Sequence, residues 1–161
     1  MRIKYLYFVV FFIFSCNGNT ENNDLDKKES AFKQSLSVLS PKSNFNIYMV
    51  IPRAGCSGCI SDAELYMQDY ITKHPTSTEI CFILTDFDSE KILRARFGSL
   101  LQSSQIIIDR DRIFGANELL KSIYPTFYFF DDAMNLKETG TFSPQTDGKR
   151  LLKKYLEKNN S

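Results

Sequence analysis

Two cysteines lie three positions apart in the stretch "VIPRAGCSGCISDAE", which runs from Val50 to Glu64. Cys56 follows an apolar run, and Cys59 stands at the head of a helical pattern. A pair with this spacing can form a redox centre, supply half of a metal site or act as a small structural staple. The choice depends on the compartment in which the chain works and on the elements that hold the pair.

The N-terminus "MRIKYLYFVVFFIFSC" has cations at Arg2 and Lys4, an apolar stretch over residues 5–14, and then Ser15 and Cys16. This order is typical of an export signal, and the apolar stretch is about half the roughly 20 residues that a membrane-spanning helix requires. The tetrad "IFSC" resembles the lipobox of bacterial lipoproteins, which implies cleavage before Cys16 and lipidation of Cys16; an ordinary signal peptide is the alternative. We therefore expect a lipid-anchored protein of the cell envelope that faces the periplasm, on a membrane that the sequence does not specify.

The chain divides into a signal peptide over residues 1–15, a polar tether over 16–27 and one domain over 28–161. Cleavage after residue 15 of the 161 would leave 146 residues, enough for a single domain with its own core. Loss of two signal-peptide cations would change 20 cations against 19 acids to 18 against 19, a net charge near −1. This balance does not suggest a nucleic-acid partner. The tether is expected because its residues are polar and lack apolar periodicity.

Within the domain, the hydrophobic period alternates between that of strands and that of helices. The pattern first predicts a helix or strap over 26–39, a strand over 45–51, a helix from Cys59 to about His74 and a strand over 79–86. It then predicts a helix over 88–101, a strand over 105–109 and a short helical or irregular link over 112–122. A hairpin over 124–142 that turns around Asp131 to Asn135 follows, and then a last helix over 146–160 whose apolar face holds Leu151, Leu152, Tyr155 and Leu156. The early strand, helix and strand form a parallel crossover, and the late hairpin is antiparallel. We expect an α/β fold, a three-layer α/β/α sandwich with a central mixed sheet.

Cys56 lies where the first strand meets the first long helix, at the end of a parallel strand where open α/β sheets place their sites. The free N–H groups and the dipole of a helix N-terminus favour a thiolate there. The helix carries its less polar residues at the helical period, and these are Cys59, Ile60, Ala63, Tyr66, Met67, Tyr70 and Ile71. Cys59 is therefore expected to face the core, so that an exposed sulfur attacks and a sheltered one resolves, as thiol exchange requires.

The sequence Cys56-Ser57-Gly58-Cys59, the later Tyr124-Pro125-Thr126 before "FYFFD", and the closing hairpin and helix together resemble the thioredoxin-like superfamily, and its extracytoplasmic TlpA-like branch most closely. The resemblance covers about Phe45 to Lys158. It implies a thiol-disulfide oxidoreductase that acts as a monomer on protein thiols or disulfides. It further implies that Pro125 follows a cis bond and packs against the disulfide while Tyr124 presents backbone to the substrate; a trans proline at a strand start is the alternative.

Two residues beside the cysteines depart from the pattern of the family that the sequence resembles. The family usually has an aromatic residue before the first cysteine, where this chain has Gly55, and often a proline before the second, where it has Gly58. We therefore expect a mildly lowered pKa at Cys56 and no strongly oxidising character. Asp62 stands at the offset of an acid that is often found in TlpA-like proteins and could pass protons to Cys59, or it could simply complement the helix dipole. A non-catalytic accessory lipoprotein with a permanent disulfide stays open as the alternative.

Other chemistries lack their residues. A zinc site needs four sulfur or nitrogen ligands, and beyond the pair the chain offers only Cys81, His74 and Cys16. No histidine follows His74 to serve copper delivery, and Arg53 occupies the place of the threonine that a peroxiredoxin-like site would need. We expect His74 at a helix end on the surface, Cys81 as a buried structural thiol, and neither a metal nor another cofactor.

Overall fold

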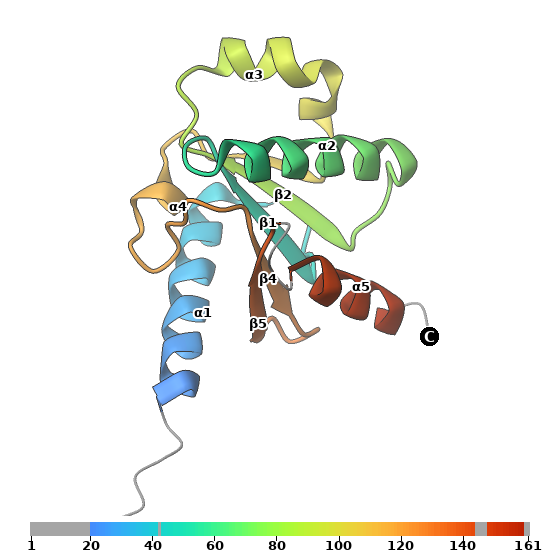
Figure 1. The fold of residues 1–161 in the computed structure, drawn as a ribbon. Coiled ribbons are helices and arrows are strands. Elements are labelled where there is room, and N and C mark those ends of the chain that lie inside the picture. The colour runs from blue at the N-terminus through green and yellow to red at the C-terminus, as the bar shows by residue number, and fades with distance from the viewer. Residues whose placement is uncertain (1–19, 42, 144–147, 160–161) are drawn as a thin grey trace, which may run out of the picture.

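The structure is a computed structural model that describes residues 20–41, 43–143 and 148–159 (Figure 1). The predicted signal peptide and the predicted lipidation at Cys16 lie outside the described residues. In chain order, the elements are α1 (Thr20–Leu39), β1 (Ile47–Pro52), α2 (Ser57–Lys73), β2 (Ile80–Thr85), α3 (Glu90–Phe97), the 3-10 helix η1 (Gly98–Gln102), β3 (Ile106–Ile108), α4 (Ile113–Ala116), β4 (Thr126–Phe130), β5 (Leu136–Thr141) and α5 (Gly148–Asn159).

The strands form one mixed sheet in the order β3-β2-β1-β4-β5. β1 and β2 are parallel, with Ile47 opposite Ile80, and β2 and β3 are parallel as well. β4 runs antiparallel to β1 and pairs with β5 in the predicted hairpin. The neighbours β1 and β2, and β2 and β3, are joined by helical crossovers and are parallel, because only crossovers can join parallel neighbours. A tight turn joins the antiparallel neighbours β4 and β5.

Helices cover both faces of the sheet, which confirms the predicted α/β sandwich (Figure 1). On one face, Met49 of β1 packs with residues of α2, α3 and α5, such as Met67 and Leu152. On the other face, Tyr48 packs with residues of α1 and α4, such as Phe32. Successive residues of β1 enter opposite cores because side chains alternate along a strand, so all six of its residues are buried.

The turn of the β4–β5 hairpin is organised by Asp131. Its carboxylate accepts hydrogen bonds from the backbone N–H groups of Ala133 (3.0 Å) and Asn135 (2.8 Å) and pairs with Lys137 at 2.7 Å. The hydrogen bonds that Lys137 and Asn135 donate hold the pKa of Asp131 well below its usual range. A side chain that satisfies several turn amides in this way explains why the predicted turn residues are polar.

Helix α1 begins at Thr20, inside the segment that the sequence predicted to be a polar tether. The described part of that segment is helical. Ion pairs one turn apart, Asp24 with Lys28 at 3.5 Å and Glu29 with Lys33 at 2.7 Å, support this polar helix. Among the described residues, no helix combines the length and the apolar character needed to cross a membrane.

Candidate redox site at the start of α2

A disulfide joins Cys56 and Cys59 at the N-terminus of α2, with their Cα atoms 5.3 Å apart. Cys56 is the N-cap of the helix, and its Sγ accepts a hydrogen bond from the Cys59 N–H at 3.4 Å. β1 ends at Pro52, so a short loop carries the pair from the carboxyl end of a parallel strand to the helix, as predicted. Sites of open α/β sheets occur at this kind of junction.

The two cysteines differ in exposure. Cys59 is buried, with 5% of its surface exposed, whereas Cys56 is half-buried. A partner molecule can therefore approach Cys56 from solvent, while Cys59 lies under it and faces the core. Thiol–disulfide exchange needs this difference, because one sulfur must meet the partner and the other must attack only from inside the protein.

The loop before β4 lies directly against the cysteine pair. The Cys56 N–H donates a hydrogen bond to the Ile123 carbonyl at 2.9 Å. Gly55 has a φ of +139°, and a Cβ at this position would overlap the Ile123 carbonyl oxygen. The absence of a side chain at Gly55 therefore allows two backbone segments to meet beside the disulfide.

Tyr124 and Pro125 lie in that same loop, but the bond between them is trans. The cis bond expected at Pro125 was wrong. Trans is the preferred isomer of most X–Pro bonds, and the loop makes its contacts with it: the Pro125 carbonyl accepts from the Phe142 N–H at 2.7 Å, and the Tyr124 carbonyl accepts from Thr126 Oγ1 at 3.0 Å. Pro125 is buried and Tyr124 is 38% exposed, while Ile123 contributes the backbone contact to Cys56.

Two acidic residues of α2, Asp62 and Glu64, differ in exposure. Asp62 is exposed and has no ion-pair or hydrogen-bond partner among the described residues. Glu64 is buried, 6% exposed, and pairs with Arg96 of α3. Burial raises the pKa of Glu64, although the positive charges of Arg96 and Arg53 oppose that rise. The ion pair between Glu64 and Arg96 was not predicted from the sequence. The only sign of it in the sequence is that Glu64 lies one helical turn after Ile60, on the apolar face of the helix.

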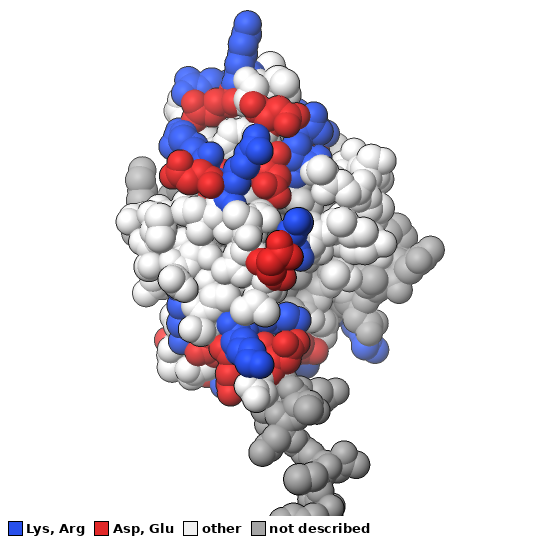
Figure 2. Space-filling model, turned by 90° about the vertical axis from the view of Figure 1, so that its left-hand side faces the viewer, with Lys and Arg blue, Asp and Glu red and all other residues white. Residues whose placement is uncertain are grey.

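Apolar side chains lie on the surface near the cysteine pair. Leu119, Ile123 and Tyr124 are large apolar or aromatic side chains that the loop before β4 exposes to solvent. Figure 2 views the side of the molecule on which α2 begins, and it shows charged side chains gathered over α3 at the top and over α1 at the bottom, with a mostly uncharged band between them that has one group of acidic and basic side chains near its centre. An exposed apolar surface of this kind is typical of a site where another molecule binds.

The remaining cysteine and histidine of the described chain lie elsewhere. Cys81 is a free thiol in β2 with no exposed surface, which confirms the predicted buried thiol, and burial raises its pKa. His74 forms the C-cap of α2, where its ring lies 4.9 Å from that of Tyr70. The described residues contain no cluster of three or more histidine, cysteine or acidic side chains that could hold a metal ion.

No protein-family model matches the chain, and no curated protein or solved structure matches it either. The structural class of the protein is therefore inferred from its own sheet topology and cysteine pair. A five-stranded mixed sheet between helices, with a Cys-x-x-Cys pair at the head of α2, is compatible with a thioredoxin-like fold. The same arrangement is compatible with redox chemistry at the pair.

Proposed function

We propose that this protein is a lipid-anchored, extracytoplasmic thiol–disulfide oxidoreductase of the TlpA-like kind that exchanges disulfides with protein substrates. The observation that carries the proposal is the disulfide at the N-terminus of α2, with Cys56 half-buried and Cys59 buried. Partial exposure at a helix N-terminus is the environment in which a cysteine thiolate is stabilised and reactive.

The proposed reaction proceeds through a mixed disulfide. In the reduced protein, the Cys56 thiolate attacks a substrate disulfide, and one substrate sulfur leaves as a thiolate that takes up a proton. Cys59, deprotonated, then attacks Cys56 Sγ, which restores the Cys56–Cys59 disulfide and releases the second substrate thiol. Two electrons pass from the pair to the substrate, and the same steps in reverse oxidise a substrate dithiol.

The substrate is proposed to be a polypeptide whose disulfide lies in a segment with apolar side chains. Leu119, Ile123 and Tyr124 offer exposed apolar surface on the loop whose Ile123 carbonyl contacts Cys56. Burial of such side chains contributes binding free energy with little dependence on the partner's sequence. Asp62 is a candidate to relay protons near the site from the exposed side of α2.

The catalytic proposal is tested by trapping. Cys59→Ser should accumulate mixed disulfides with partner proteins, because the resolving sulfur is missing, whereas Cys56→Ser should accumulate few. Non-reducing electrophoresis followed by mass spectrometry of the trapped species measures this difference. A reversed pattern, or no capture by either variant, would contradict the assigned roles.

The anchor is a separate part of the proposal, because Cys16 lies outside the described residues. Mass spectrometry of the mature N-terminus should find an acylated Cys16, and Cys16→Ala should release or misprocess the protein. An unmodified mature chain that begins elsewhere would contradict the anchor without affecting the redox proposal.

A second candidate function is an accessory lipoprotein whose disulfide stays closed. The trans bond before Pro125 favours it, because the resemblance to redox-active relatives implied a cis bond there. Titration of the pair against glutathione and dithiothreitol series separates the two functions. A pair that remains oxidised across the series supports the accessory function, whereas a pair that equilibrates supports the oxidoreductase.

A further inference from the structure

A cavity of about 730 Å³ lies between α2 and α5, and neither cysteine of the disulfide lines it. Its walls are apolar and come from three parts of the chain: Tyr66 of α2, Phe142 after β5, and Leu152 and Leu156 of α5. Tyr66 is ten residues after Cys56, roughly 15 Å along α2. The volume falls within the range of about 300–1,000 Å³ that is usual for small-molecule sites.

The rim of this cavity is basic. Lys149 and Lys153 lie one turn apart on α5, and both line the cavity. Lys153 Nζ lies 3.7 Å from Glu157 Oε1, so its charge is partly balanced. Lys149 Nζ instead lies 4.8 Å above the centre of the Phe142 ring and has no acidic partner among the described residues. One end of the cavity therefore presents a cation that no described acidic side chain balances, above an apolar wall.

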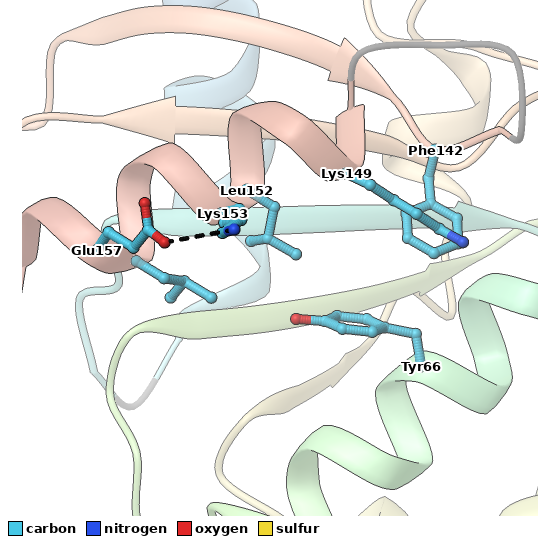
Figure 3. Close-up of a pocket in the computed structure, with 7 residues that line it drawn as sticks. Tyr66, Phe142, Lys149, Leu152, Lys153 and Glu157 are labelled. Atoms are coloured by element: carbon cyan, nitrogen blue, oxygen red, sulfur yellow. Dashed lines mark ion pairs between the residues drawn. The ribbon is translucent and has the colours of Figure 1, made fainter.

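The hydroxyl group of Tyr66 also faces this cavity. Figure 3 shows the Tyr66 ring across the gap from Leu152 and Phe142, with its hydroxyl pointing along the gap. The ring packs against Phe142 with centroids 5.8 Å apart, but the hydroxyl makes no hydrogen bond with any described residue. A group of this kind is usually satisfied by water or by a ligand.

These features lie in a row along α5. From Lys149 to Glu157 the helix rises roughly 12 Å, and the apolar residues Leu152 and Leu156 lie between the free cation and the far end. A ligand that matches this order has an anionic group at one end and an unbranched apolar chain behind it. A compact anion would leave the apolar walls exposed to water, and a neutral hydrocarbon would make no use of the positive charge of Lys149.

We propose that the cavity between α2 and α5 binds a single-chain carboxylate amphiphile, with its carboxylate at Lys149 and its alkyl chain along Phe142, Leu152, Tyr66 and Leu156. The proposal does not depend on the redox function, because the cavity contains neither cysteine of the pair. It assigns to this chain a binding site for a fatty-acid-like molecule.

The test uses decanoate and decyltrimethylammonium, which share a chain length and differ in the sign of the head group, both kept below their micelle-forming concentrations. Isothermal titration calorimetry should show that the protein binds decanoate and binds the cationic amphiphile at least about tenfold more weakly. In NMR spectra, decanoate should shift the methyl signals of Leu152 and Leu156. Equal binding of both amphiphiles, no binding of either, or shifts confined to other residues would overturn the proposal.

A pair of matched variants locates the head group. Lys149→Glu should weaken decanoate binding by about tenfold or more, because it places a negative charge beside the carboxylate. Lys154→Glu is the control, since Lys154 is on the same helix but pairs with Glu138 at 3.2 Å outside this cavity; it should change binding by less than about twofold. Equal losses in both variants would show a general effect of charge and overturn the site.

Leu156→Gln tests the position of the ligand's alkyl chain. This variant should weaken decanoate binding while leaving the circular dichroism spectrum and melting temperature close to those of the unmodified protein.

Two other occupants of the cavity would give different results. A second copy of the chain would shift the same methyl signals with protein concentration alone, and a membrane surface would require anionic vesicles and leave free decanoate unbound. Either result would overturn the amphiphile site.

Discussion

At the scale of single residues, the geometry around the disulfide depends on Gly55. Its φ of +139° lies in the region that glycine alone adopts readily, and the Ile123 carbonyl occupies the place of a side chain. Gly58, between the cysteines, is different: it is part of α2, and a Cβ there would meet no atom within 4 Å. The two glycines therefore form a natural pair for comparison.

We expect Gly55→Ala to destabilise the protein by about 2 to 3 kcal/mol, because the alanine is strained and must displace the Ile123 backbone. Gly58→Ala should instead raise stability by about 0.5 kcal/mol, because alanine loses less backbone entropy on helix formation. Urea denaturation of the oxidised proteins measures both changes. Similar effects of the two substitutions would contradict the role given to Gly55.

Glu64 gives stability a pH dependence. Burial raises its pKa in the folded state above the ordinary value of 4.5, so the folded state holds a proton that the unfolded state has already lost. Stability from this group therefore falls as pH rises from about 4.5 through the folded-state pKa. The stability of the unmodified protein relative to Glu64→Gln should decrease over that range, as urea denaturation at several pH values would show.

Glu90 is the control for this measurement, because its hydrogen bond to Arg110 lowers its pKa. The folded state then loses the proton first, and stability relative to Glu90→Gln should increase as pH rises toward about 4.5. A pH-independent difference for Glu64→Gln, or one of the same sign as for Glu90→Gln, would contradict the assigned environment of Glu64.

At the scale of elements, α1 closes the second core. Phe32 has no exposed surface, and its ring packs against those of Tyr48, Phe114, Tyr128 and Phe130 at centroid distances of 4.7–5.2 Å. Glu29 of the same helix accepts a hydrogen bond from the Leu136 N–H of β5 at 2.7 Å. Helix α1 is therefore part of the folded domain.

Phe32→Ala should destabilise the protein by about 3 to 5 kcal/mol, because it removes the aromatic centre of a buried cluster and leaves a cavity. Val38→Ala, on the same helix at a position that is 62% exposed, should change stability by less than about 0.5 kcal/mol. Thermal denaturation followed by circular dichroism compares the two. Equal and small effects would mean that α1 does not pack on the sheet in solution.

At the scale of the whole molecule, the two cores make the fold largely independent of the disulfide. The bond spans a sequence separation of only 3, so it closes a very short loop. The entropy that such a loop removes from the unfolded chain corresponds to about 2 kcal/mol. A protein held mainly by burial on both faces of its sheet can open this bond without unfolding.

We therefore expect the reduced protein to stay folded at neutral pH, with stability lower by about 2 kcal/mol or less than that of the oxidised form. Urea denaturation with and without dithiothreitol measures the difference, and near-ultraviolet circular dichroism reports whether tertiary packing is retained. Unfolding on reduction would contradict a redox cycle and favour the accessory function with a structural disulfide.

The sequence by itself determined the order of elements, the apolar face of α2, the place of Cys56 and Cys59 at its head, and the polar turn at Asp131. These features depend on local properties, namely the period of apolar residues, helix ends and turn chemistry, which a few neighbouring positions contain. The mixed sheet followed because short connections leave few ways to join such elements.

The tertiary structure alone decided the contact of Ile123 with Cys56, the trans bond at Pro125, the burial of Glu64 against Arg96 and the cavity beside Tyr66. Most of these features join segments far apart in the chain, so they depend on how packed elements are positioned. The isomers of an X–Pro bond differ by only about 0.5–1 kcal/mol, so the surrounding contacts decide between them. The polar run after Thr20 became helical for the same reason, because packing of the later turns of α1 stabilises a helix that its first residues do not predict.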